Sequence, residues 1–472
     1  MLPPLIERRE RSHAKPRSGE RGFTMALVTV ALVTIIAMAA LSIDIGTLYQ
    51  AKDEAQRAAD AAALTAARMI SISGITGDPG NASNSWQTIC GGTTSPATLA
   101  AINVAQQNLI SGVAATSGNV SVQYGGGSAG ATNTSCTGAG AAFGVNPVVS
   151  VTVTSGKLPI FFARIFRLFP NGNFSNTTTS ATATAEVFNS SNSGSVAASM
   201  IPVQPRCVKP WIIPNIDPGK GGAAFVSPLD GSIQNPGVLG GKVIGETFNL
   251  AADCAPGAFN CHGRNMPDNP PRLNGTNLDY VPALVSGNPT AALSCATANT
   301  FQEAIGGCDE TTAYTCGTPS GTSGATQADL NENPVRPSGD GGDSPTAAQC
   351  LINQSAGNDS LDTTTFPFQI KAGSGSALVQ SGIVNSNSII TTSNSIVTVP
   401  IYDSAGAAFP RGNHEPPVTI VGFLQVFINN VDTTNGNINV TVMNVAGCSN
   451  DAAGNPTVTG TSPVPIRLIT PP

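Results

Sequence analysis

The first strong pattern along the chain is an uninterrupted apolar run near the N-terminus. Residues 23–43 contain no charged side chain. At about 1.5 Å per residue, a helix of this length spans the roughly 30 Å hydrocarbon core of a bilayer. The segment 51–68 follows without a turn signal and is rich in alanine and other helix formers. The pattern predicts one long helix over 23–70, which crosses a membrane with its first half and continues outside it.

The segment 51–68 is charged on one side and alanine-rich on the other. Alanine side chains allow close packing but bury little apolar area. Two interpretations therefore stay open, a solvated stalk and a packing surface for a partner helix. Asp44, at the outer end of the apolar run, is expected in the headgroup region, where its charge costs little.

Beyond the helix, the pattern indicates a small α+β module over 71–188. Residues 96–110 have apolar positions at helical spacing, whereas 119–124, 148–154 and 180–187 alternate as half-buried strands do. The module should therefore contain one helix and three strands.

The aromatic segment 158–169, between the last two of these strands, has two interpretations. It combines bulky apolar residues with Arg164 and Arg167, a composition that suits an amphipathic helix docked on a membrane or a partner. Its position favours a second use, covering the sheet of its own module.

The character of the chain changes again after residue 188. Residues 189–218 combine a Ser/Asn/Gly-rich stretch, typical of a linker, with a proline-rich segment expected to be extended and held by Trp211 and a disulfide at Cys207. Residues 219–375 are rich in turn formers and cysteine, and 376–472 recover strand character. We expect a loop-rich region followed by an antiparallel β region. The strands expected in the latter are 395–403, 418–431, 438–445 and 464–469, with a hairpin turn at Asn435-Gly436.

Composition and charge indicate the cellular compartment of the protein. Only 11% of residues are charged, which suits a β-rich extracytoplasmic protein better than a cytosolic helical enzyme. The 10 cysteines, combined with a membrane-targeting segment, predict an oxidising compartment and up to five disulfides. Residues 1–22 form a basic head directly before the apolar run. Such a head more often sets membrane topology than binds nucleic acid, so we expect it in the cytoplasm, with the bulk of the chain periplasmic or extracellular.

The N-terminal segment has three conceivable fates. An uncleaved anchor is favoured over a signal peptide, because the apolar run continues past the small-x-small site at 37–39. The third fate is leader processing, because Gly22-Phe23 after a basic segment resembles the site where type IV prepilins are cut after Gly. Those pilins carry Glu at the fifth mature position, where this chain has Leu27.

Two short motifs follow the apolar run. Asp44, Gly46 and Tyr49 form an Asp-x-Gly-x-x-Tyr pattern, and Asp60 lies in an Ala-Asp-Ala-Ala-Ala pattern about ten residues later. With these motifs, the stretch around 21–68 resembles the N-terminal segment of TadG-like proteins of the Flp, or tight-adherence, pilus-assembly system. The resemblance implies a bacterial inner-membrane protein, with the lipid bilayer and other pilus-assembly or envelope proteins as partners and self-association through the N-terminal helix as a further option.

No catalytic, cofactor or metal site is expected from the motifs. The stretch 230–234, DGSIQ, lacks the last serine of the Asp-x-Ser-x-Ser metal motif that many TadG-like chains carry in a von Willebrand A domain. Three other groups have ligand-type residues without the spacing of a known metal site: Cys254 with Cys261 and His262, His414 with Glu415, and Asp340 with Asp343.

Three functions follow from these patterns. The leading hypothesis is a non-catalytic, membrane-anchored envelope protein for assembly or anchoring of a Flp-type pilus. The second is a minor pilin-like filament subunit, processed after Gly22. The third is a membrane-tethered adhesin or enzyme whose site lies in 219–472, where loop-built sites leave no regular spacing.

Overall fold

The computed structural model describes the chain from residue 20 to residue 469 with gaps. The described residues are 20–80, 87–126, 130–158, 177–195, 201–252, 273–274, 277–283, 285, 289, 299–312, 314–316, 327–329, 343–405, 417–448 and 456–469. The basic head 1–19, most of the aromatic segment 158–169, and Cys254, Cys261, His262, Asp340, His414 and Glu415 lie outside them.

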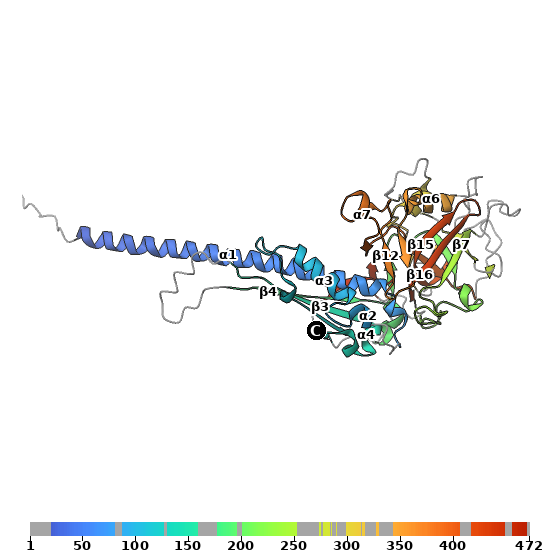
Figure 1. Cartoon of the computed structure of the whole chain (residues 1–472), viewed down its shortest axis with the longest axis horizontal. Helices are drawn as coiled ribbons and strands as arrows, with labels where there is room; N and C mark the ends of the chain where they lie inside the picture. The colour runs from blue at the N-terminus through green and yellow to red at the C-terminus, as the bar shows by residue number, and fades with distance from the viewer. Residues whose placement is uncertain are drawn as a thin grey trace, which may run out of the picture.

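The N-terminal helix, α1, runs without a break from Glu20 to Ile72. Its 53 residues correspond to a rod of about 80 Å. The helix ends before Gly74, which adopts a left-handed backbone conformation with φ of 73°. Figure 1 shows the first half of α1 projecting from the protein, while the second half lies along the folded part. The predicted long helix is confirmed.

An α+β module packs along the second half of α1. Its described strands form a five-stranded antiparallel sheet in the order β18-β4-β3-β1-β2. The main helix beside α1 is α3 (Pro96–Gln107). The strands are β1 (Val120–Gly126), β2 (Ala131–Asn133), β3 (Pro147–Thr154), β4 (Ser180–Val187) and β18 (Ile466–Ile469), and the short helices are α2 (Gln87–Cys90) and α4 (Ala142–Val145). The expected helix and three strands are therefore present, each close to its expected position.

The fifth strand of this sheet comes from the far end of the chain. The sequence assigns 464–469 to the C-terminal β region, but β18 pairs with β4, with Ile466 opposite Val187 and Ile469 opposite Thr184. The segment 189–199 also differs from expectation. It is no linker in its described part: Asn189, Ser190 and Ser193 are fully or almost fully buried. A polar segment can be buried in this way because its side chains find backbone partners: Asn189 donates to the Val445 carbonyl and Ser190 to the Gly447 carbonyl.

The second body of the fold is a β-barrel. Among the described residues, six strands close on themselves in the order β15-β14-β6-β9-β7-β16 and back to β15. They are β6 (Trp211–Pro214), β7 (Thr247–Ala252), β9 (Asn277–Pro282), β14 (Ile396–Tyr402), β15 (Pro417–Asp432) and β16 (Asn437–Gly447). The β15–β16 hairpin turns at the expected place, and Gly436 has a φ of 73°.

The barrel joins regions that the sequence separates. Three of its strands come from 211–282 and three from 396–447, so the proline-rich segment and the loop-rich and antiparallel regions share one core. Two of the pairings, β6 with β14 and β7 with β9, are parallel. The strands from 211–282 are only four to six residues long, and this shortness hides them among turn residues.

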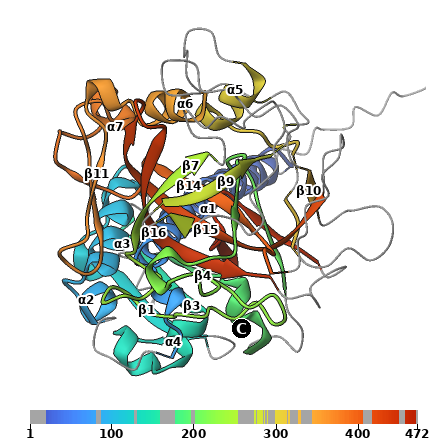
Figure 2. The same cartoon turned by 90° about the vertical axis from the view of Figure 1, so that its right-hand side faces the viewer.

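The remaining elements surround the barrel (Figure 2). The helices are α5 (Thr300–Gly306), α6 (Asp343–Leu351) and α7 (Ala377–Gln380). The short strands are β5 (Val203–Pro205), β8 (Leu273–Asn274), β10 (Gln327–Asp329), β11 (Ser360–Asp362), β12 (Gln369–Lys371), β13 (Ile389–Ile390) and β17 (Val458–Gly460). Three disulfides join described cysteines: Cys90–Cys136, Cys207–Cys308 and Cys316–Cys448. The fold is thus a long N-terminal helix followed by a mainly β, disulfide-containing region, as expected.

Candidate functional site

The first half of α1 is an apolar surface without protein cover. Its large apolar side chains between residues 23 and 43 are 41–77% exposed. They point in all directions around the helix: Phe23, Met25, Leu27, Val28, Val30, Leu32, Val33, Ile35, Ile36, Met38, Leu41 and Ile43. Among the described residues, α1 is the one helix long and apolar enough to cross a membrane. An apolar patch of this extent needs a lipid or protein cover.

The second half of α1 carries a buried alanine face. Eight alanines have no exposed surface, and their spacing of three or four residues places them on one side of the helix. They are Ala51, Ala55, Ala58, Ala59, Ala62, Ala63, Ala66 and Ala67. This face packs on α3 and on β3 and β4 of the chain's own module. The solvated stalk is therefore wrong. The second interpretation, a packing surface for a helix, is confirmed in part: the helix is α3 of the same chain, and β3 and β4 cover the rest of the face.

Polar contacts fix the position of α1 along the module. The Lys52 ammonium donates to the backbone carbonyl of Ser180, and Gln56 Nε2 donates to that of Thr182 at 3.3 Å. On the α3 side, the Ser111 amide donates to a Glu54 carboxylate oxygen at 2.6 Å. This amide, with the side chain of Gln50, holds the pKa of Glu54 below its usual value. These bonds set the register of the helix against β4 and the segment after α3.

The motif residues lie just before and within this docked half. Asp44 is buried, with 4% of its surface exposed, and Thr47 Oγ1 donates to its backbone carbonyl at 2.8 Å. Its place at the level of the lipid headgroups stays a prediction. Tyr49 is 71% exposed, and a Cβ added to Gly46 would meet no atom within 4 Å. Asp60 accepts a hydrogen bond from Gln56 Nε2 at 2.8 Å.

The expected processing site falls inside α1. Gly22 and Phe23 belong to its first turn, and Phe23 is 72% exposed. Cleavage after Gly22 stays a prediction.

The C-terminal end of α1 docks on the barrel through polar contacts that the sequence did not indicate. Asn444, on β16, donates from Nδ2 to the Ser71 carbonyl at 2.9 Å. Asn189 Nδ2 donates to Thr76 Oγ1 at 3.1 Å and to the Val445 carbonyl at 3.0 Å. A Cβ on Gly74 would lie 2.7 Å from the Met443 carbonyl oxygen. We call the contacts of residues 71–77 with the barrel and Asn189 the helix–barrel junction. Isolated asparagines in strands and loops carry no sequence signal for such a role.

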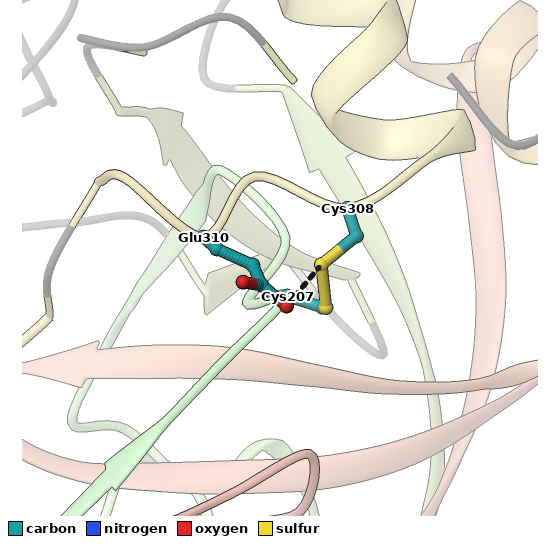
Figure 3. A group of neighbouring side chains, drawn as sticks. All are labelled: Cys207, Cys308 and Glu310. Atoms are coloured by element: carbon teal, nitrogen blue, oxygen red, sulfur yellow. Dashed lines mark hydrogen bonds between the residues drawn. A yellow bond between two sulfur atoms is a disulfide. The ribbon is translucent and has the colours of Figure 1, made fainter. Parts of the chain in front are cut away.

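One described group of side chains has the composition of a metal site. Cys207, Cys308 and Glu310 lie together beside α5 (Figure 3). The two sulfurs are joined in a disulfide, and Glu310 Oε1 lies 4.0 Å from Cys308 Sγ. Because a metal-binding cysteine must be a free thiolate, this group is a disulfide with a neighbouring carboxylate. The disulfide expected at Cys207 is present, and Trp211 beside it is fully buried.

A single apolar helix near the N-terminus, docked by its second half on a disulfide-containing β-rich body, suggests single-pass membrane anchoring. Residues 22–69 match the model of a family described as putative Flp pilus-assembly TadE/G-like. This match covers the apolar half of α1 and the alanine face together, and it confirms the resemblance inferred from the motifs. It also supports a role of the chain in the Flp pilus-assembly system. No curated protein and no solved structure matches the chain.

Proposed function

We propose that the protein is a non-catalytic, single-span envelope protein that serves the assembly or anchoring of a Flp-type pilus. The observation that carries the proposal is the division of α1 into two halves. The first half is apolar and uncovered, and the second is buried in the module with eight fully buried alanines. Because α1 has no break between its apolar half and its docked half, it would hold the folded body at a fixed position relative to the membrane.

The proposed topology places residues 1–22 in the cytoplasm and the module and barrel outside the inner membrane. The basic head supports this orientation. The disulfides support an oxidising compartment for the folded body. Other pilus-assembly or envelope proteins are the proposed partners. Self-association, where it occurs, would use the uncovered apolar half of α1, because the alanine face is occupied within the chain.

A genetic experiment tests this proposal in the native cells. Deletion of the gene should abolish surface pili while the pilin is still made, and the full chain should restore them. A second form of the gene replaces residues 1–43 with a cleavable signal peptide, which exports the folded body without its anchor. This form should not restore pili. Restoration by the soluble protein would contradict the anchoring role.

The filament-subunit alternative rests on the same uncovered half of α1, which would pack between other helices in a filament. The two functions separate when pili are sheared from the cells and purified. An assembly or anchoring protein stays with the membrane. Recovery of the chain in the filaments, beginning at Phe23, would support the subunit instead.

A further inference from the structure

A cavity of about 260 Å³ lies where the end of α1 meets the barrel. α1 contributes Arg68 to its wall, and the segment before β6 contributes Lys209. No carboxylate belongs to the described residues that line it. The Cys207–Cys308 disulfide of Figure 3 forms another part of the wall. The cavity thus gathers two cationic side chains from different parts of the fold, without an acidic partner on its described walls.

Lys209 is buried, with 5% of its surface exposed. Its ammonium donates to the Gly307 carbonyl at 2.7 Å and more weakly to the Ala304 carbonyl at 3.5 Å, both at the C-terminal end of α5. These bonds stabilise the buried ammonium, because a cation is favourable at the C-terminal end of a helix. An ammonium group has three N–H donors, so one remains for a further acceptor.

Arg68 and Ser462 also have unused donors. The bond found for Arg68 in the described part of the chain runs from Nε to the Thr391 carbonyl at 3.3 Å, and a guanidinium has five N–H donors. Ser462 Oγ accepts from Gln425 Nε2 at 2.9 Å and from the Val464 amide at 3.1 Å. Its hydroxyl hydrogen has no acceptor among the described residues. Ser462 is itself buried, with 7% exposed, so an unused donor there costs free energy.

We propose that this cavity binds the carboxylate of a small ligand, held by Arg68, Lys209 and the hydroxyl of Ser462. Arginine donors fit the two oxygens of a carboxylate in a planar, bidentate arrangement. Leu351 and Ile396 form an apolar part of the wall, which suits a short aliphatic body on the ligand. Exposed Asn394 and Thr461 on the rim leave a way in from solvent.

The charge of the site favours a monoanion. Burial lowers the pKa of Lys209 to about 7, so Arg68 is the one constant positive charge of the pair at neutral pH. A bound carboxylate would restore the charge of Lys209 by stabilising its ammonium form. Because Arg68 belongs to α1 and the Lys209 amide is bonded to β14 through the Thr398 carbonyl, the bound ligand would also join the helix to the barrel. The inference does not depend on the role in pilus assembly.

Calorimetric titration of the full chain in detergent tests the proposal. The probe is N-acetyl-alanyl-alanine with a free carboxylate, and its control is the same dipeptide as the carboxamide, at equal ionic strength. The acid should bind and the amide should not. Arg68→Gln and Lys209→Met should each weaken binding about tenfold or more, as expected for loss of a charge-assisted hydrogen bond. Lys220→Met, at an exposed lysine away from the cavity, is the matched control and should bind as the wild type does.

Two further measurements keep the outcome decisive. Ser462→Ala removes one hydroxyl without changing a charge, and it should also weaken binding of the acid. It serves as the test variant if Arg68→Gln or Lys209→Met does not fold. Inorganic phosphate serves as the competing anion. Equal binding of acid and amide, unchanged affinity in all three variants, or tighter binding of phosphate than of the acid would overturn the proposal.

Discussion

At the scale of single residues, Lys209 is a cation in an environment unlike water. It is buried beside a disulfide and bonded to backbone carbonyls rather than to a carboxylate. Burial disfavours its charged form and lowers its pKa from 10.5 to about 7. The unfolded chain therefore binds more protons at this site than the folded chain does between these two pH values. Stability should consequently rise with pH across this window.

Lys209→Met tests this dependence. The stability of the wild type relative to the variant should increase between pH 8 and 9.5, by at most about 1.4 kcal/mol per pH unit. Urea unfolding of both proteins at the two pH values measures the change. Lys157→Met, at an exposed lysine of the module, is the control, and its stability should change with pH as that of the wild type does. If the free energies of unfolding of Lys209→Met and the wild type changed equally with pH, the ammonium would not be desolvated.

At the scale of elements, the pattern of apolar and polar positions predicts most of what is regular. It gives α1, α3 and the strands β1, β3, β4, β14, β15 and β16, because each is long enough to show its period. It does not give β6, β7 and β9, which are short and lie among turn formers. Their pairing depends on contacts between residues far apart in the chain, such as Ile213 with Ile401. The role of the alanine face was also beyond the pattern, because alanine tolerates both solvent and close packing.

The alanine face makes a sharp prediction for α1. Ala62→Leu adds three carbon atoms to a side chain that has no exposed surface, so overpacking should lower the free energy of unfolding by about 1–3 kcal/mol. Ala61→Leu is the matched control, since Ala61 is only partly buried on the same turn. Denaturant unfolding of both variants in detergent compares them. Equal losses would mean that the face does not pack on the module as described.

At the scale of the whole molecule, three parts follow one another: the uncovered apolar half of α1, the module along its second half, and the barrel at its end (Figure 1). The last strand, β18, returns from the barrel to the module and pairs there with β4. Sequence reasoning could not place the barrel relative to the helix. The contacts at the helix–barrel junction come from Asn189, Asn444 and Gly74, whose residue types are common in ordinary loops and strands.

Gly74 offers a test of the helix–barrel junction. Gly74→Ala would place a Cβ 2.5 Å from Ile244 Cγ2 at a φ of +73°, so it combines backbone strain with a clash. Gly112→Ala is the matched control, because Gly112 has a φ of +77° but no atom within 4 Å of the added carbon. Gly74→Ala should lower the melting temperature more than the control, and amide exchange at the junction should increase. Equal losses of melting temperature in Gly74→Ala and Gly112→Ala would mean that backbone strain alone causes them. This result would contradict the close packing of Gly74 at the junction.

The central claim is that α1 is a permanent anchor for the folded body, and the mature N-terminus tests it most directly. The measurement is mass spectrometry of the chain recovered from separated membrane and soluble fractions of the native cells. We predict a membrane-bound chain that begins at or near Met1. A soluble chain that begins near Ala40, or a chain that begins at Phe23, would contradict the claim, the first in favour of a signal peptide and the second in favour of a processed filament subunit.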